Sequence, residues 1–274
     1  MKPAMRARIL TSRFLPVIVF PIRTREVSRV IFRVIKLGLR WLFSSREFAN
    51  YTYDLTQTNK DYLAWFVSDL THAPISEIRG YFEELETDSE LLAYIQTRLT
   101  DHRRGGEIDD RPHFGRRLGW YAIVRATKPL VLVETGTEKG LGSLVLARAI
   151  ERNSNNGILY TLDIEPSAGL LIGNRFSETI VQKIGDSISS ITDLSDIDFF
   201  IHDSDHSAEH ERAEFDAVLS RLTPNAICLS DNSHVTNVLS EWSKQIGRQF
   251  SFFKEEPLSH WYRGCGIGAS MSSR

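Results

Sequence analysis

The sequence predicts an α/β fold in which helices cover both faces of a mainly parallel sheet. From about residue 112 onward, short runs of apolar and β-branched residues alternate with segments of helical periodicity, which is the pattern of βαβ units. The chain has 274 residues, of which 42% are hydrophobic and 25% charged, so it can bury a full core. We expect three parts: a basic segment at 1–46, a helical cap at 47–111 and the α/β domain at 112–274.

The first part is a basic amphipathic segment. Residues 1–46 carry eleven Lys and Arg residues against Glu26 alone, whereas the rest of the chain has 22 basic and 34 acidic residues. Within residues 24–44 the basic side chains recur every three or four positions, and Val27, Ile31 and Trp41 fall on the opposite side of a helix. Such a helix lies on an anionic membrane surface or packs on its own domain, and both interpretations stay open.

The composition also indicates a location. The apolar run at 14–22 is too short to span a bilayer and no small-residue cleavage site follows it, which disfavours a secretory signal. Two cysteines, Cys228 and Cys265, form neither a disulfide framework nor a metal site, and favour a reducing compartment. We expect a cytoplasmic protein, peripheral at the inner membrane surface. An Arg-rich transit peptide is the minor alternative.

The second part reads as a helical cap. Apolar residues recur with helical period over 59–73, 74–88 and 89–103, and Pro74 marks a plausible helix start. Residues 104–113 are Gly-rich and charged, which is typical of a loop or linker.

The third part alternates strands and helices. Helices are expected at 142–151, 208–222 and 235–246, and strands at 131–135, 157–165, 178–187, 197–206, 226–231, 250–256 and 264–270. In a parallel sheet, ligands bind beyond the carboxyl ends of the strands.

The loop "VLVETGTEKGLGS" at 131–143 is the first such strand end. Gly136, Gly140 and Gly142 let the backbone approach a ligand and expose helix N–H groups. Their spacing of one, five and seven differs from the one, three and six of the nicotinamide fingerprint. Glu134 at the strand end would repel a pyrophosphate and suits a cofactor with a cationic amino acid end.

With these landmarks the sequence resembles the class I S-adenosylmethionine-dependent methyltransferases over roughly residues 112–270. Asp163 ends the second strand, and "GDS" at 185–187 ends the third, as in that family. The resemblance implies a Rossmann-like, doubly wound sheet of seven strands with an antiparallel last strand, and S-adenosyl-L-methionine as the cofactor. The cofactor-binding residues it implies are Glu134, Gly136, Gly140, Gly142, Ser143, Asp163, Asp186, Ser187 and Asp203.

Polar residues also follow the fourth and fifth strands. "FFIHDSDHS" places Asp203 and Asp205 past the fourth strand, and "CLSDNSH" places Asp231 and Asn232 past the fifth. Adjacent strand ends bring these oxygens together, and such a set suits Mg²⁺ or another hard divalent cation. The pattern is similar to metal-dependent O-methyltransferases of the catechol and sugar types, which implies Asp203, Asp231 and Asn232 as metal ligands.

Two histidines are candidate general bases, because a neutral imidazole can take the proton of a metal-bound hydroxyl. His234 is preferred, since Asp-x-x-His after the fifth strand resembles the sugar O-methyltransferases. The catechol type places its base on the loop after the fourth strand, nearer His206. His202 precedes Asp203 on the strand and is expected to point into packing.

The predicted activity is therefore O-methylation of a small molecule or sugar, with a lipid-linked or surface glycan as the first acceptor. A homodimer and an anionic membrane surface are further expected partners. Nucleic acid is not expected, because the α/β domain is acidic and lacks an Asn-Pro-Pro-Tyr-like segment for a flipped base. Two alternatives stay open: a membrane-associated binding module without catalysis and a nicotinamide-dependent oxidoreductase.

Overall fold

A computed structural model describes residues 15–49, 51–101, 108–109 and 111–273. The chain divides into two compact units: one comprises Arg46–Leu258 with Arg263–Arg274, and the other comprises Met1–Ser45 with Ser259–Tyr262. Residues 1–14 of the predicted basic segment lie outside the described residues, as do residues 102–107 and 110 at the predicted helix end and linker. The three-part division expected from the sequence stays a prediction.

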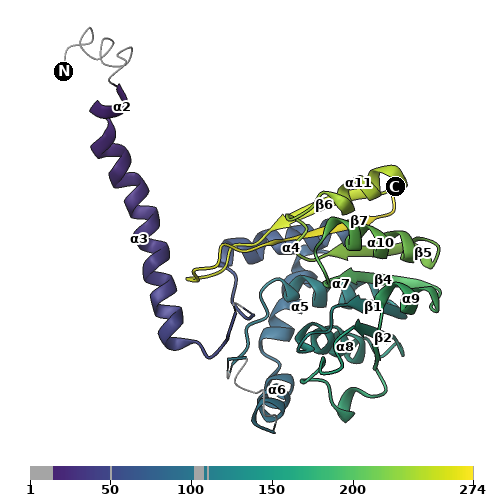
Figure 1. Cartoon of the computed structure of the whole chain (residues 1–274). Helices are drawn as coiled ribbons and strands as arrows, with labels where there is room; N and C mark the ends of the chain where they lie inside the picture. The colour runs from purple at the N-terminus through teal and green to yellow at the C-terminus, as the bar shows by residue number, and fades with distance from the viewer. Residues whose placement is uncertain (1–14, 50, 102–107, 110, 274) are drawn as a thin grey trace. The chain divides into compact units, whose positions relative to one another are not determined.

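The larger unit is built on one sheet of seven strands in the order β3-β2-β1-β4-β5-β7-β6 (Figure 1). β1 pairs in parallel with β2 and β4, β2 with β3, and β4 with β5, whereas β7 runs antiparallel between β5 and β6. This confirms the predicted doubly wound α/β fold with its antiparallel last strand. The strands are β1 Val131–Thr135, β2 Ile158–Asp163, β3 Ile180–Ile184, β4 Ile197–His202, β5 Leu222–Ser230, β6 Gln249–Lys254 and β7 Gly266–Met271.

One face of the sheet carries the main apolar core. Helices α9, α10 and α11 supply in turn Ile191, Phe215 and Trp242, which are fully buried in one cluster with Val133 and Phe200 of the strands. The Phe200 and Phe215 rings meet edge to face with centroids 5.6 Å apart. The bounds of these helices are α9 Ser187–Thr192, α10 Ala208–Leu219 and α11 Val238–Gln245.

The opposite face is covered by α7 (Arg117–Thr127) and α8 (Leu141–Asn153). Consecutive strand residues point to opposite faces, so Glu134 points away from the side that Val133 faces. Its carboxylate accepts a hydrogen bond from Ser143 of α8. This face therefore holds the glycine loop and the helix that follows it.

The cap helices α4 (Gln57–Thr71), α5 (Ile75–Glu86) and α6 (Ser89–Asp101) belong to the larger unit. The Thr56 hydroxyl accepts a hydrogen bond from the Asn59 amide and caps α4. Between α5 and α6, Asp88 is buried and pairs with the buried Arg148 of α8 at 2.7 Å. These contacts fix the cap to the α8 side of the fold.

The smaller unit contains α2 (Leu15–Ile18) and the 25-residue α3 (Phe20–Ser44). Pro21 in the first turn of α3 suits a helix start, because its missing N–H would have no partner there. Near the end of α3, the Trp41 and Trp261 rings meet with centroids 5.4 Å apart. Within the described part of the chain, we find no helix whose length and apolarity would let it cross a membrane.

Candidate functional site

A pocket of about 600 Å³ opens at the carboxyl ends of β1 to β4. This volume is in the range of small-molecule and cofactor sites. Five of the predicted cofactor-binding residues line it: Gly136, Asp163, Asp186, Ser187 and Asp203. Lining residues that the sequence reasoning did not single out include Ala168, Ser204 and His210.

Gly136 is required by close contact between two strand ends. Its φ is +84°, and a Cβ at this position would lie 2.0 Å from the backbone oxygen of Asp203. The Gly136 N–H donates to the Leu162 carbonyl at 2.8 Å, which holds the loop to the end of β2. Gly140, with φ of +88°, then starts α8. The loop thus brings its backbone against the ends of both neighbouring strands.

Glu134 is buried and is not among the residues that line the pocket. It is 1% exposed, and its carboxylate accepts hydrogen bonds from the hydroxyls of Ser143 and Thr161, the latter at 2.8 Å. A Cβ on Gly142 would lie 2.4 Å from the Glu134 Oε1, so this position also requires glycine. Burial raises the pKa of Glu134 to about 7 against the opposing effect of the two hydroxyls.

The acidic residues after β2 and β3 are held by backbone N–H groups. Asp163 accepts hydrogen bonds from the amides of Glu138 at 2.8 Å and Glu165 at 2.9 Å. Asp186 caps α9 by accepting from the Ser189 amide at 2.7 Å. Both residues lie at the pocket wall. The ends of β2 and β3 thus place two oriented carboxylates at its rim.

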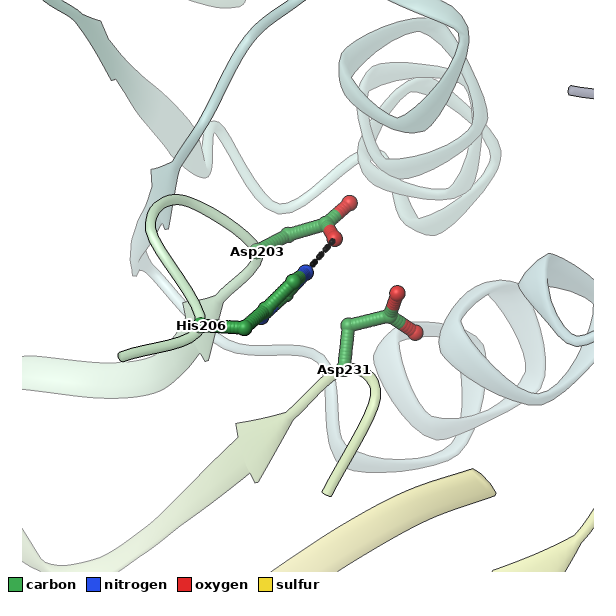
Figure 2. A group of neighbouring side chains, drawn as sticks. All are labelled: Asp203, His206 and Asp231. Carbon is green, nitrogen blue, oxygen red and sulfur yellow. Dashed lines mark ion pairs between the residues drawn. The ribbon is translucent and has the colours of Figure 1, made fainter. Parts of the chain in front are cut away.

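Next to this pocket, Asp203, His206 and Asp231 form a cluster, shown in Figure 2. One ligand atom from each residue lies within 4.8 Å of the others, and the Asp203 Oδ1 is 3.9 Å from the His206 Nε2. The same His206 nitrogen is 2.8 Å from the Asn232 amide nitrogen. Asp203 also lines the pocket, so the cluster and the pocket share a wall.

A buried arginine, Arg116, is the main site residue that the sequence reasoning missed. Its Nη2 donates to the Asp231 Oδ2 at 2.6 Å, and its Nε contacts the other Asp231 oxygen. Its Nη1 contacts the Tyr53 hydroxyl at 2.6 Å, and Tyr53 donates to Glu255. These partners come from distant parts of the chain, so no local motif signals them.

The pKa values of the two aspartates, Asp203 and Asp231, are shifted in opposite directions. Burial raises the pKa of Asp203 well above its ordinary value, and the Asp231 charge raises it further. Burial also raises the pKa of Asp231, but the Arg116 charge together with hydrogen bonds from Asp203 and Arg116 holds it below its ordinary value. Burial lowers the pKa of His206. The resulting cluster has a charged Asp231 beside a neutral imidazole.

The other predicted residues lie outside the cluster. His234 is exposed on the loop after β5. Asp205 lines the pocket and accepts hydrogen bonds from the amide and hydroxyl of Ser207 at 3.1 and 3.0 Å, near the start of α10. His202 is fully buried, and its Nδ1 lies 2.7 Å from Glu214. Of the two candidate bases, the fold brings His206 into the cluster.

The oxygen atoms of the cluster and of Asn232 form a candidate donor set for a divalent ion. Carboxylate and amide oxygens are the ligands that Mg²⁺ prefers. Arg116 contacts both oxygens of Asp231, but a carboxylate has about four lone-pair sites and ligating carboxylates are usually hydrogen-bonded by outer partners. The Asn232 nitrogen contacts His206, which leaves its carbonyl oxygen as a donor. Asp203, Asp231 and Asn232 therefore fit a hard divalent ion, and Mg²⁺ stays a prediction.

Comparison with known proteins gives a family match to part of the chain and a fold. Residues 133–233 match the family described as a methyltransferase domain. The fold is similar to that of the O-methyltransferase TomG of Streptomyces achromogenes, involved in tomaymycin synthesis and solved in complex with SAM. The two share 16% identity with a TM-score of 0.50, over 69% of this chain and 92% of TomG.

A methyltransferase from Geobacter sulfurreducens is similar to the same degree. It shares 16% identity and a TM-score of 0.50, over 73% of this chain and 96% of that one. No curated protein matches the chain in sequence. The matched residues 133–233 run from β1 to just past β5 and contain the glycine loop, the pocket's acidic residues and the cluster.

Proposed function

We propose that this chain is a class I S-adenosylmethionine-dependent methyltransferase that methylates a hydroxyl oxygen of a small molecule or sugar, since residues 133–233 match a methyltransferase domain. The observation that carries the proposal is the shared wall at Asp203, which places an acidic cluster directly beside the cofactor pocket. A methyl donor in the pocket and an acceptor hydroxyl at the cluster would then meet at the ends of β4 and β5.

In this proposal S-adenosylmethionine occupies the pocket at the ends of β1 to β4. Asp163 accepts hydrogen bonds from the ribose hydroxyls, and Asp186 with Ser187 lies along the adenine edge. The Gly136 loop approaches the amino acid end. The bound SAM of TomG, a protein of similar fold, supports this choice of cofactor.

The acceptor hydroxyl binds at the cluster. Asp203, Asp231 and Asn232 would hold Mg²⁺ or another hard divalent ion, which would lower the pKa of a hydroxyl bound there. The hydroxyl oxygen attacks the methyl carbon, the bond from that carbon to sulfur breaks, and S-adenosylhomocysteine leaves. Arg116 orients Asp231 through its two contacts.

His206 takes the hydroxyl proton. Burial lowers its pKa, so that its imidazole is neutral and able to accept a proton at neutral pH. Its Nε2, which faces Asp203, accepts from the Asn232 amide at 2.8 Å, so in this proposal the acceptor hydroxyl displaces that amide contact before His206 takes the proton. His206 is therefore proposed as the base in preference to the exposed His234.

The first experiment is a calorimetric titration of the full-length protein with S-adenosylmethionine, S-adenosylhomocysteine and NAD, each with and without Mg²⁺. We expect the first two to bind and NAD not to bind. Binding of NAD alone would overturn the proposal in favour of an oxidoreductase. Binding of S-adenosylmethionine with no methylation of any phenol or sugar hydroxyl would favour a binding module.

The second experiment compares His206→Asn with the matched control His234→Asn, using an acceptor found by screening phenols and sugars for methylation. Loss of a general base lowers kcat by roughly 10² to 10⁴, so His206→Asn should fall in this range while the control retains turnover. The reverse result would make the proposed base wrong. Turnover that persists in EDTA and does not respond to added Mg²⁺ would exclude the metal.

A further inference from the structure

Helix α3 (Phe20–Ser44) exposes a long apolar surface. None of its 25 residues is buried. Seven of its large apolar side chains are at least half exposed outside its first turn, with Phe43 at 88% and Phe32 at 68%. The seven are Val27, Val30, Ile31, Phe32, Leu39, Leu42 and Phe43. Soluble proteins rarely leave apolar surface of this extent without a partner.

The same helix carries a basic face. It has six basic residues and one acid, Glu26. Arg25, Arg29, Arg33, Lys36 and Arg40 follow one another at intervals of three or four residues, which puts them on one side of the helix. Val27, Ile31 and Leu42 lie on the other side, whereas Phe32 and Phe43 fall beside the basic residues. The apolar sector covers roughly half of the circumference, which is broader than the narrow seam of a coiled coil.

Aromatic residues gather at the end of this helix within the same unit. The Trp41 ring packs edge to face on Trp261, with centroids 5.4 Å apart, and Trp261 lies 6.4 Å from Tyr262. Trp and Tyr are the side chains enriched where a bilayer meets water, since each combines an apolar ring with a polar group. A helix of 25 residues is about 37 Å long, so both faces extend well beyond this cluster.

We propose that α3 binds the surface of an anionic lipid bilayer, with its axis along the membrane plane. This partner uses both faces of the helix at once, because the apolar side enters the boundary between headgroups and acyl chains while the basic side meets anionic headgroups. A nucleic acid would engage the basic side and leave the apolar side in water. A second copy of the chain would cover the apolar side and leave the basic charges unmatched.

The test is cosedimentation of the full-length protein with vesicles of phosphatidylcholine alone or mixed with phosphatidylglycerol. We expect the protein to bind the mixed vesicles. This binding should weaken as the salt concentration rises from about 0.1 M to about 1 M, because the electrostatic screening length then falls from roughly 10 to 3 Å. A basic residue near an anionic surface adds about fivefold to binding. Arg33→Glu with Arg40→Glu should therefore weaken it at least 25-fold, by the same rough estimate.

A matched control reverses two exposed charges outside α3, Arg212→Glu with Lys244→Glu, and should bind as the unmodified protein does. Each methylene moved into the lipid contributes about fourfold. Replacing Ile31 and Ile35 by Ser should thus weaken binding by at least roughly tenfold, with the helix checked by circular dichroism.

Three results would overturn the proposal. The first is that the full-length protein does not bind the vesicles that contain phosphatidylglycerol. The second is undiminished binding by the Arg33→Glu, Arg40→Glu variant or by the Ile31→Ser, Ile35→Ser variant. The third is a dimer in analytical ultracentrifugation that the serine variant dissociates without any vesicle binding, because a second copy would then cover the apolar face. None of these results depends on the methyl acceptor.

Discussion

Replacing Glu134 by Gln should remove a pH dependence from the stability of the fold. The Glu134 carboxylate is 1% exposed and accepts hydrogen bonds from two hydroxyls, with no cation in direct contact among the described residues. Burial raises the pKa of this group from its ordinary 4.5 to about 7. Gln keeps the size of the side chain and its ability to bond to hydroxyls, but it does not ionise.

The direction follows from proton binding. Between pH 4.5 and 7 the unfolded chain releases the Glu134 proton while the folded chain keeps it, so the folded state binds more protons and stability falls as pH rises. The slope is about 1.4 kcal/mol per pH unit for one group. Over this interval the unmodified protein should therefore lose about 3 kcal/mol relative to Glu134→Gln. Above pH 7 the difference should level off.

The assay is urea unfolding of both proteins at several pH values from 4.5 to 8, followed by the fluorescence of tryptophans that include the buried Trp120. Other titrating groups are common to both proteins and cancel in the difference. Glu138→Gln is a matched control, because Glu138 lies on the same loop and its side chain is 60% exposed. Its effect should stay within about 0.5 kcal/mol at neutral pH. A difference between unmodified protein and Glu134→Gln that does not change with pH would refute the reasoning.

Two further substitutions test the packing of the site. Gly136→Ala should abolish S-adenosylmethionine binding in calorimetry, because its Cβ would meet the Asp203 backbone oxygen. The control Gly247→Ala should retain binding, because Gly247 also has a positive φ but has open space around it. Arg116→Met should lower the free energy of unfolding, measured in urea, by about 3 to 5 kcal/mol, because it leaves Asp231 charged and unpaired in the interior. Adding Asp231→Asn to this variant should restore part of the lost stability. Purely additive effects would contradict the proposed pairing.

The strands and most helices could be predicted because their signals are local. The apolar run at 131–135 became β1 without change. Strand β5 starts earlier than the predicted residue 226, at Leu222, which pairs with Ile197 ahead of a register shift.

Two α-helices of the larger unit were not predicted, α7 and the short α9. The first eight residues of α7 are all buried, so this stretch lacks the exposed polar face of an amphipathic helix. The segment "SISSIT" of α9 has little apolar period, and its start depends on the Asp186 cap. Periodicity therefore finds amphipathic elements and misses helices that are buried all round or made by a single cap.

The part of the candidate site that lies directly after the ends of parallel strands could be predicted from the sequence. Residues directly after parallel strands meet at one edge of the sheet, and this rule places Asp203 near Asp231 without any knowledge of side-chain directions. The rule does not distinguish His206 from His234, because both follow a strand by a few residues. Only the packed structure shows which imidazole turns toward the cluster.

Arg116 illustrates why the remaining chemistry could not be predicted. It lies 115 residues before Asp231, ahead of the first strand, and its charge alone would predict an exposed side chain. Its burial is possible because the Asp231 carboxylate and the Tyr53 hydroxyl meet it together. Beside this cation Asp231 stays charged, while burial and the Asp231 charge raise the pKa of Asp203. Arg116 therefore sets the charge of the acidic cluster, and it reaches the cluster because it stands at the N-cap of α7, which packs on the rest of the fold.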